Sequence, residues 1–465
     1  MTFAHYTERI DGLQYLADKM ELSGSRVRRY LMQLPFCTRK ETLETHFDIL
    51  QKALDILSDP AAQATFMQLQ HLFSRVHDVR GTLRALKENR VLDEVELFEM
   101  KYLAVLCKDV AGICLTLAFP YDNPDPLEEV RMILDPDNAG TVSFHLYDSY
   151  SPALSQARHQ AAATDPEKET EQWTRLQDLV AREELAVRKR LSSQLSSLYP
   201  VLSESFDSLA RMELWFAKAS LARRFSMVRP GLAGVRSPDD LKIEGMFNPG
   251  IADALSAMNR VFQPVSLTLG RGPCLLTGAN MSGKTVVLKT LALIQVLTQF
   301  SFFVPARKAS VPLVKDVFLV SGDKQDQSRG LSSFAAEMVF LDQIMARIRG
   351  GLRALVLVDE PARTTNPSEG AAILCALVEF MEDHHVMSLL STHYGDLGLS
   401  CRKIRVSGFD SSKVKDRPDP SKMNEYINYS LVEDLSDSVP MEALRIARLL
   451  GVDESFIQSA QKYVK

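Results

Sequence analysis

Gly278-Ala-Asn-Met-Ser-Gly283-Lys284-Thr285 is the stretch of this chain that says most about its fold. It matches the phosphate-binding pattern G-x-x-x-x-G-K-[ST], which joins a buried strand to a helix. The preceding run Pro273-Cys-Leu-Leu-Thr277 predicts a short buried strand, and residues 286–300 predict a helix. The sequence therefore places strand, loop and helix in the order that the pattern requires.

The residue types of this loop suit a bound triphosphate. Backbone N–H groups of a glycine-rich loop and of a helix N-terminus carry partial positive charge that stabilises phosphate oxygens. Lys284 adds a cation for the β and γ oxygens, and the Thr285 hydroxyl is expected to hold Mg²⁺. The alternative to a phosphate-binding loop is a glycine-rich turn between strand and helix that binds no ligand. The loop residues expected to enclose the phosphates are Gly278, Ala279, Asn280, Met281, Ser282 and Gly283.

Two further strands are predicted to end in chemically active residues. The apolar run Ala354-Leu-Val-Leu-Val358 leads into Asp359 and Glu360, which we expect to be a second Mg²⁺ contact and a general base for water. The next apolar run ends at Ser391 and is followed by Thr392-His393, so we expect His393 to sense the γ-phosphate. A histidine at a strand end often has no function, which is the alternative. Short apolar runs alternating with helices predict an α/β domain with a mostly parallel sheet.

The composition limits the class of protein. A chain of 465 residues with 46% hydrophobic content can bury two or three cores. The most apolar window, residues 291–304, is too short to span a bilayer, and the N-terminus has no signal-peptide pattern. The six cysteines show no C-x-x-C spacing, as expected for reduced thiols. We therefore expect a cytoplasmic protein that does not bind membranes.

The chain is predicted to contain two domains of different class. Residues 7–228 follow a mainly helical period, which predicts an all-α region in residues 1–235. A small β insert is expected near residues 138–150, where a glycine turn precedes alternating residues. A Pro- and Gly-rich run at residues 230–238 marks the expected boundary. Residues 236–465 form the predicted P-loop domain.

The second half of the chain resembles the ATPase domain of the MutS family, most closely the bacterial branch that often ends in a small nuclease domain. The first half is similar with less specificity, in residues 24–35 and 147–154. The matching segments of the second half are Gly278 to Thr290, Val304-Pro-Ala306, Gly330-Leu-Ser-Ser-Phe-Ala-Ala-Glu-Met338, Leu357-Val-Asp-Glu360, Pro367-Ser-Glu-Gly370 and Thr392-His-Tyr394.

The resemblance implies an ATPase that binds ATP and Mg²⁺ and works as a dimer, either of identical chains or with a related subunit. It implies that Asn280 contacts the nucleotide. It also implies that Ser332 and Ser333, at the start of a helix, reach the γ-phosphate held by the other subunit. A simple helix cap at Ser332 is the alternative. Residues 437–451 are similar to the family's closing helices, which pack the dimer.

Departures from the family pattern bear on the target of the ATPase. The mismatch-reading domain, the DNA clamp expected between residues 161 and 209, and the terminal nuclease domain have no counterpart in the sequence. Pro361-Ala-Arg-Thr-Thr-Asn366 replaces the usual glycine-bearing stretch after the carboxylates. The family contains small, clamp-less members that are similar to this chain and are associated with adenosylcobalamin-dependent amino-acid aminomutases. The resemblance to them implies an ATPase that reactivates such an enzyme.

Three functions therefore stay open at the level of sequence. The first is an ATPase that changes the conformation of a protein client, for example an aminomutase. The second is a DNA-binding ATPase of mismatch repair or recombination type, with double-stranded DNA held through phosphate contacts. The third is an interaction protein with a vestigial nucleotide site. The basic residues available for phosphate contacts are Arg188, Lys189, Arg190, Arg223 and Arg224.

Overall fold

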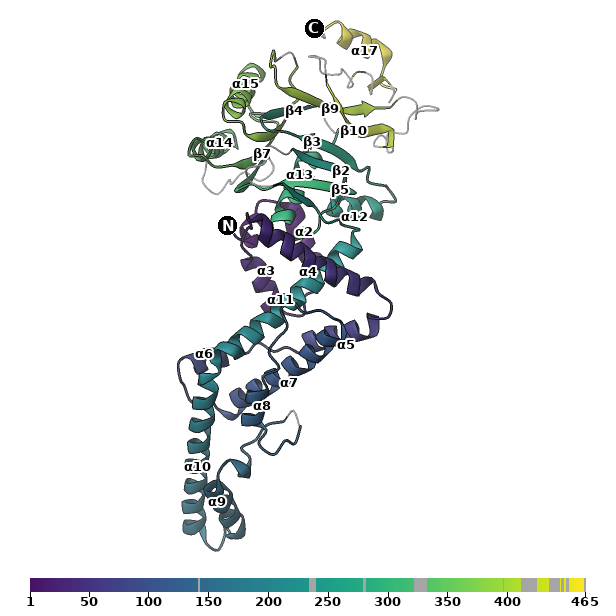
Figure 1. Ribbon diagram of the computed structural model, residues 1–465. Helices are drawn as coiled ribbons and strands as arrows, with labels where there is room; N and C mark the ends of the chain where they lie inside the picture. The colour runs from purple at the N-terminus through teal and green to yellow at the C-terminus, as the bar shows by residue number, and fades with distance from the viewer. Residues whose placement is uncertain are drawn as a thin grey trace. The chain divides into compact units, whose positions relative to one another are not determined.

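The computed structural model describes most of the chain and divides into two compact units (Figure 1). Unit 1 comprises Met1–Met20, Met32–Asp48 and Ser220–Lys465, and unit 2 comprises Glu21–Leu31 and Ile49–Ala219. This division differs from the expected boundary at residues 235 and 236, because the first helices pack within unit 1. The described residues are 1–140, 143–233, 240–278, 282–321, 333–395, 397–410, 425–434, 444, 447–448 and 451–463.

Unit 1 is built around a six-stranded sheet in the order β10-β9-β4-β8-β7-β6. All neighbouring strands are parallel except β10, which pairs antiparallel with β9. The three strands predicted from sequence are confirmed as β4, β7 and β8. The strands are β4 (Pro273–Thr277), β6 (Asp316–Val320), β7 (Ala354–Asp359), β8 (Met387–Ser391), β9 (Arg402–Phe409) and β10 (Ile427–Glu433).

A second, four-stranded sheet in unit 1 has the order β1-β5-β2-β3. Strands β2 and β3 alternate buried and exposed residues, as expected for a sheet with one covered face. Helix α12 (Pro249–Ala257) connects them along the chain. The strands are β1 (Gly231–Ala233), β2 (Leu241–Met246), β3 (Val265–Leu269) and β5 (Lys308–Pro312).

Helices cover both faces of the six-stranded sheet. Helix α13 (Lys284–Gln299), which follows the phosphate-binding loop as predicted, is buried along most of its length and packs on β6, β7 and β8. Helices α14 (Ser333–Arg349) and α15 (Pro367–Asp383) share an apolar core with the other face of the sheet (Figure 1). A further helix, α17 (Glu454–Gln461), lies near the C-terminus.

The described residues of unit 2 form helices and one 3₁₀ turn. Helix α7 begins with a capping box, in which Asp93 and Glu96 each accept the other's backbone N–H. The boundary with unit 1 falls within α3, α4 and α11. The elements are α3 (Ser25–Gln33), α4 (Lys40–Ser58), α5 (Gln63–Ser74), α6 (Arg80–Lys87), α7 (Glu94–Thr116), α8 (Glu128–Leu134), η1 (Asp148–Tyr150), α9 (Pro152–Ala163), α10 (Thr170–Ser197) and α11 (Tyr199–Arg224).

The β insert expected near residues 138–150 is not a strand in the described part of that segment. Residues 143–147 lack regular structure and lead into η1. The buried ammonium of Lys101 donates hydrogen bonds to the Ser143 carbonyl at 3.2 Å and the Tyr147 hydroxyl at 2.9 Å, and it pairs with Asp135. Contacts with this buried cation, and not pairing with a strand, therefore hold the two ends of residues 143–147.

No helix in the described ranges of the chain is both long enough and apolar enough to cross a membrane.

A buried carboxylate holds helix α1 (Phe3–Thr7) and the turn before helix α2 (Asp11–Lys19) within unit 1. Asp316, the first residue of β6, is fully buried. It accepts a hydrogen bond from the Tyr6 hydroxyl at 2.7 Å and pairs with Arg347 at 2.8 Å and Arg9 at 3.6 Å. Burial and the hydrogen bond to Asp316 raise the pKa of Tyr6, so its hydroxyl stays a donor.

Replacing Asp316 with alanine should destabilise unit 1 strongly, because Tyr6 and two arginines would lose a buried partner. We expect a loss of about 3–5 kcal/mol in the free energy of unfolding, measured by urea denaturation with circular dichroism. Asp240, whose exposed carboxylate lies 3.9 Å from Lys242, is the matched control. Asp240→Ala should change stability by under about 0.5 kcal/mol, and an equal effect of both variants would contradict the role given to Asp316.

Candidate nucleotide-binding site

The phosphate-binding loop uses backbone conformations that favour glycine. Gly278 has φ 145° and Gly283 has φ 83°, and Gly283 directly precedes α13. A Cβ atom on Gly283 would also lie 3.2 Å from the Tyr429 ring. Ser282 is 4% exposed, and its hydroxyl oxygen is buried without a hydrogen-bond partner among the described residues. Such an orphaned polar atom suits a loop shaped to hold a ligand.

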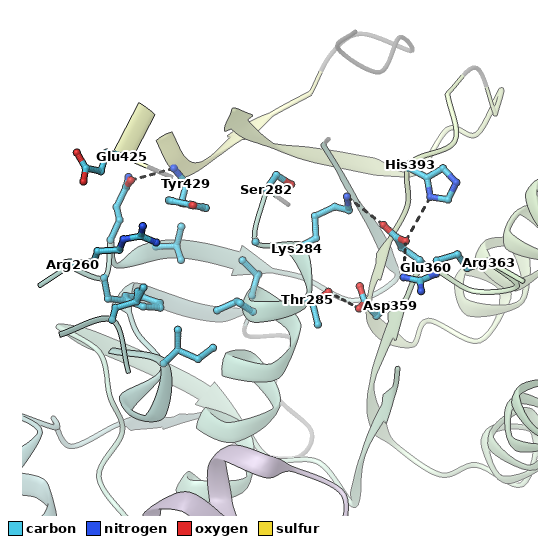
Figure 2. Close-up of a pocket in the computed structure, with 18 of the residues that line it drawn as sticks. Arg260, Ser282, Lys284, Thr285, Asp359, Glu360, Arg363, His393, Glu425 and Tyr429 are labelled. Atoms are coloured by element: carbon cyan, nitrogen blue, oxygen red, sulfur yellow. Dashed lines mark hydrogen bonds and ion pairs between the residues drawn. The ribbon is translucent and has the colours of Figure 1, made fainter. Parts of the chain in front are cut away.

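Lys284, the first residue of α13, points into the site from the helix N-terminus (Figure 2). Its side chain is 4% exposed. The ammonium donates a hydrogen bond to the Gly278 carbonyl at 2.8 Å and lies 3.4 Å from Glu360 Oε1. A buried cation needs anionic or polar partners, and phosphate oxygens can replace both of these.

The adjacent Thr285 is joined to the carboxylate at the end of β7. Its hydroxyl donates to Asp359 Oδ2 at 2.6 Å, and the hydroxyl of Ser391, at the end of β8, donates to Asp359 Oδ1 at 2.5 Å. Both oxygens of the Asp359 carboxylate are thus held in place. Ser391 was missed by sequence reasoning, because only the register of β8 against β7 brings it to Asp359.

Glu360 and His393 face each other at the same edge of the sheet (Figure 2). Glu360 Oε2 lies 3.7 Å from His393 Nδ1 and 3.9 Å from the exposed Arg363 guanidinium. The imidazole packs against the Tyr394 ring, with centroids 4.4 Å apart. Glu360 is therefore surrounded by three basic side chains, those of Lys284, His393 and Arg363.

These residues line one cavity of about 1110 Å³ within unit 1. The end opposite Glu360 carries Arg260 and Tyr429 (Figure 2), and Phe262 and the exposed Val261 also line the cavity. Burial raises the pKa of the Tyr429 hydroxyl, and the positive charge of Arg260 opposes that shift. The cavity thus pairs an aromatic end with a charged end, which is the arrangement that a nucleotide needs.

Gln263 fixes the strand that carries Tyr429. Its side-chain amide donates to Asn428 at 2.9 Å and to Ser430 at 3.1 Å, and its oxygen accepts the Tyr429 N–H at 3.1 Å. The sequence offers no signal for these contacts, because Gln263 precedes β3 and the other residues belong to β10.

Most of the predicted site residues meet in this cavity. Ser282, Gly283, Lys284, Thr285, Asp359, Glu360 and His393 line it, and Gly278 accepts the hydrogen bond from Lys284. Ala279, Asn280, Met281 and Ser332 lie outside the described residues. Ser333 begins α14, but its side chain is also outside them. The nucleotide contacts assigned to Asn280, Ser332 and Ser333 therefore remain predictions.

A buried strand, a glycine loop with Lys284 and Thr285, and an Asp-Glu pair at the end of β7, which β8 separates from β4 in the same parallel sheet, together define a P-loop nucleotide-hydrolase site. Residues 274–465 match the family model for MutS domain V, so this part of the chain is a P-loop ATPase domain. The match supports the predicted ATPase activity of this domain and ATP as its ligand.

Curated proteins with similar sequences extend the comparison. Endonuclease MutS2 of Lactobacillus helveticus (strain DPC 4571) is 28% identical over 320 residues, which are 66% of this chain and 37% of that protein. Endonuclease MutS2 of Brevibacillus brevis (strain 47 / JCM 6285 / NBRC 100599) is 29% identical over 314 residues, which are 64% of this chain and 36% of that protein. DNA mismatch repair protein MutS of Thermus aquaticus is 33% identical over 235 residues, which are 50% of this chain and 27% of that protein.

The chain thus spans about a third of the length of these relatives. The match over residues 274–465 agrees with the predicted resemblance of the second half of the chain to the MutS ATPase domain. The comparisons do not point to an aminomutase-reactivating branch.

Lys284→Ala should abolish ATP binding, because the loop loses the cation that faces the phosphates. We expect the dissociation constant to rise at least about a hundredfold, measured with a fluorescent ATP analogue. Lys289, on the same helix, lies 3.8 Å from Asp11 instead and is the matched control. Lys289→Ala should bind normally, and normal binding by Lys284→Ala would remove the assignment of the loop.

Proposed function

We propose that this protein is a MutS-type ATPase that couples ATP binding and hydrolysis to a conformational change in a bound partner, and that the partner is double-stranded DNA. The observation that carries the proposal is the convergence of Lys284, Thr285, Asp359, Glu360 and His393 on one cavity of the MutS domain V. DNA is favoured as the partner because the similar proteins are named as a DNA mismatch repair protein and as endonucleases.

The residues around Asp359 fit Mg²⁺, which prefers oxygen ligands. Thr285 and Asp359 would hold the ion, and the hydroxyl of Ser391 keeps the Asp359 carboxylate oriented toward Thr285. When bound, the ion would neutralise charge on the phosphate oxygens. The chain itself supplies the remaining electrostatics through Lys284 and the N-terminus of α13.

The proposed general base is Glu360. Its carboxylate lies at the edge of the cavity, 3.4 Å from Lys284, and is 13% exposed. ATP binding would draw Lys284 toward the phosphates and leave Glu360 free to accept a proton from the attacking water. His393 lies 3.7 Å from Glu360 and would contact the γ-phosphate or that water.

The working unit in this proposal is a dimer with composite sites. Helix α14 begins at Ser333, and its N-terminal end carries the partial positive charge that favours an anion. The proposed role of this end is to contact the γ-phosphate bound by a second subunit. The second subunit is either an identical chain or a related one.

A protein client is the second candidate, and one observation favours it. Helix α10 ends at Ser197 and α11 begins at Tyr199, so only Leu198 separates them. No clamp domain is inserted between these two fully described helices. The comparisons, however, give an aminomutase client no support. We therefore keep a protein client as an outcome of the test below.

Glu360→Gln should bind ATP but hydrolyse it at least about a hundredfold more slowly, because the amide cannot accept the proton from water. The ATP-bound variant should form a dimer, detected by light scattering. Labelled duplex DNA is then titrated with this variant, with and without ATP, at two salt concentrations.

The DNA proposal predicts ATP-dependent binding that weakens as the salt concentration rises. A plot of the logarithm of the association constant against the logarithm of the salt concentration should have a slope of about −0.9 for each phosphate contact. Absence of binding at physiological salt would contradict DNA as the partner and favour a protein client. Turnover at the normal rate would show that Glu360 is not the base.

Ser391→Ala should weaken the response to Mg²⁺, because Asp359 loses the hydroxyl that orients it. We expect the Mg²⁺ concentration for half-maximal ATPase activity to rise about tenfold. Ser388 is the control, since it is buried on the same strand and its hydroxyl has no hydrogen-bond partner among the described residues. A shift of the same size in Ser388→Ala would assign the effect to packing of β8 and contradict the role of Ser391.

A further inference from the structure

The turn after the proposed base adopts an unusual backbone. Glu360 has φ 46° and Ala362 has φ 58°, and Pro361 lies between them. Residues with a Cβ atom rarely adopt these left-handed conformations, which persist where surrounding contacts hold them. Residues 360–366 contain no glycine, so neighbouring groups must fix the turn.

The turn is held from two sides. On the side of β8, the Glu360 N–H donates to the Ser391 carbonyl at 3.2 Å and to its hydroxyl at 3.0 Å. On the side of α14, the Ala362 N–H donates to Glu337 Oε1 at 3.3 Å. Ala362 is fully buried and Glu337 is 7% exposed. A helix on the sheet face therefore contacts the backbone two residues after Glu360.

We propose that Glu337 is a positioning residue for hydrolysis: its buried carboxylate holds the Glu360–Ala362 turn and so aims Glu360 at the reacting water. The proposal rests on the proposed function of Glu360 as the base. Glu337 is not among the described residues that line the cavity, so it acts through the turn and not by contact with ATP.

Physical chemistry supports this role over simple packing. A buried carboxylate is costly unless donors satisfy it, and the Ala362 N–H is one of the donors to Glu337. The Glu360 carboxylate lies 3.4 Å from Lys284 and 3.7 Å from His393, and both contacts depend on the direction in which the turn points it. Misplacing a catalytic group by about 1 Å can cost on the order of a hundredfold in rate.

The position of Glu337 also links its contact with Ala362 to the proposed dimer contact at the start of α14. Glu337 follows Ser333 by four residues, which is about one helical turn along α14. The start of α14 is the segment proposed to contact the nucleotide of a second subunit. A displacement of this helix would therefore reach Glu360 through Glu337.

The test compares Glu337→Leu with Glu337→Gln in the full-length protein. Leucine removes the acceptor, whereas the glutamine oxygen can still accept the Ala362 N–H. We expect Glu337→Leu to lower kcat on the order of tenfold to a hundredfold, with the ATP dissociation constant unchanged within about twofold. Glu337→Gln should keep most of the activity. Glu213, a buried carboxylate of unit 2, gives the control variant Glu213→Leu, which should keep kcat.

A double variant separates positioning from general destabilisation. In the Glu360→Gln background, Glu337→Leu should lower kcat no further, because the residue through which it acts is already disabled. A further loss of the same factor would overturn the proposal. Normal kcat in a folded Glu337→Leu protein, or a loss in Glu337→Gln equal to that in Glu337→Leu, would also overturn it.

If Glu337→Leu does not fold, Glu337→Asp against Glu337→Gln decides the question. Aspartate keeps the charge but withdraws the acceptor by one methylene. A positioning role therefore predicts that Glu337→Asp hydrolyses ATP slowly and that Glu337→Gln stays active. The reverse order of activities would contradict that role. Failure of the proposed function itself is distinguishable. It would appear as no ATPase activity in the wild-type protein, whereas failure of this proposal leaves the wild-type activity intact.

Discussion

The parallel register of three strands is the constraint on which the site depends. Leu276 of β4 and Asp359 of β7 both pair with Ser391 of β8, so the carboxyl ends of these strands meet at one edge of the sheet. Ligands of open α/β sheets bind at this edge. The loop after β4, the carboxylates after β7 and the histidine after β8 converge because this register holds. Shifting one strand by a single residue would separate Asp359 from Thr285.

Around this edge, the contacts of the charged residues are those that a nucleotide would rearrange. Lys284 is bound to the Gly278 carbonyl and faces Glu360, while both oxygens of Asp359 accept hydroxyl hydrogen bonds. Phosphate oxygens compete directly for Lys284. In the proposed mechanism, binding of ATP would therefore free Glu360 from Lys284 and so favour hydrolysis.

Local sequence patterns were sufficient to predict much of the site. The strand before the loop, the helix after it, Lys284, Thr285, Asp359 and Glu360 each follow from a motif or an apolar run, and the parallel-sheet rule then brings them together. Gln263, Ser391 and Glu337 could not be assigned roles in this way. Their partners lie on other strands or helices, so only the tertiary structure reveals the contacts.

The difference between local sequence patterns and contacts between distant segments also explains the two features of the fold that differ from expectation. Residues 143–147 follow the alternating pattern of a strand, but Ser143 and Tyr147 bind the Lys101 ammonium, and this described segment is not part of a sheet. The first helices belong to unit 1 because of contacts such as Tyr6 with Asp316, which are more than three hundred residues apart in the chain. Periodicity within a segment contains no information about such partners.

The most direct test is a crystal structure with Mg²⁺ and a non-hydrolysable ATP analogue. The central claim predicts that Lys284 leaves the Gly278 carbonyl to contact the β- and γ-phosphates, and that Thr285 and Asp359 hold the ion. It also predicts that the adenine lies at the end of the cavity that carries Tyr429. A nucleotide bound elsewhere, or bound here with Lys284 still on the Gly278 carbonyl, would contradict it.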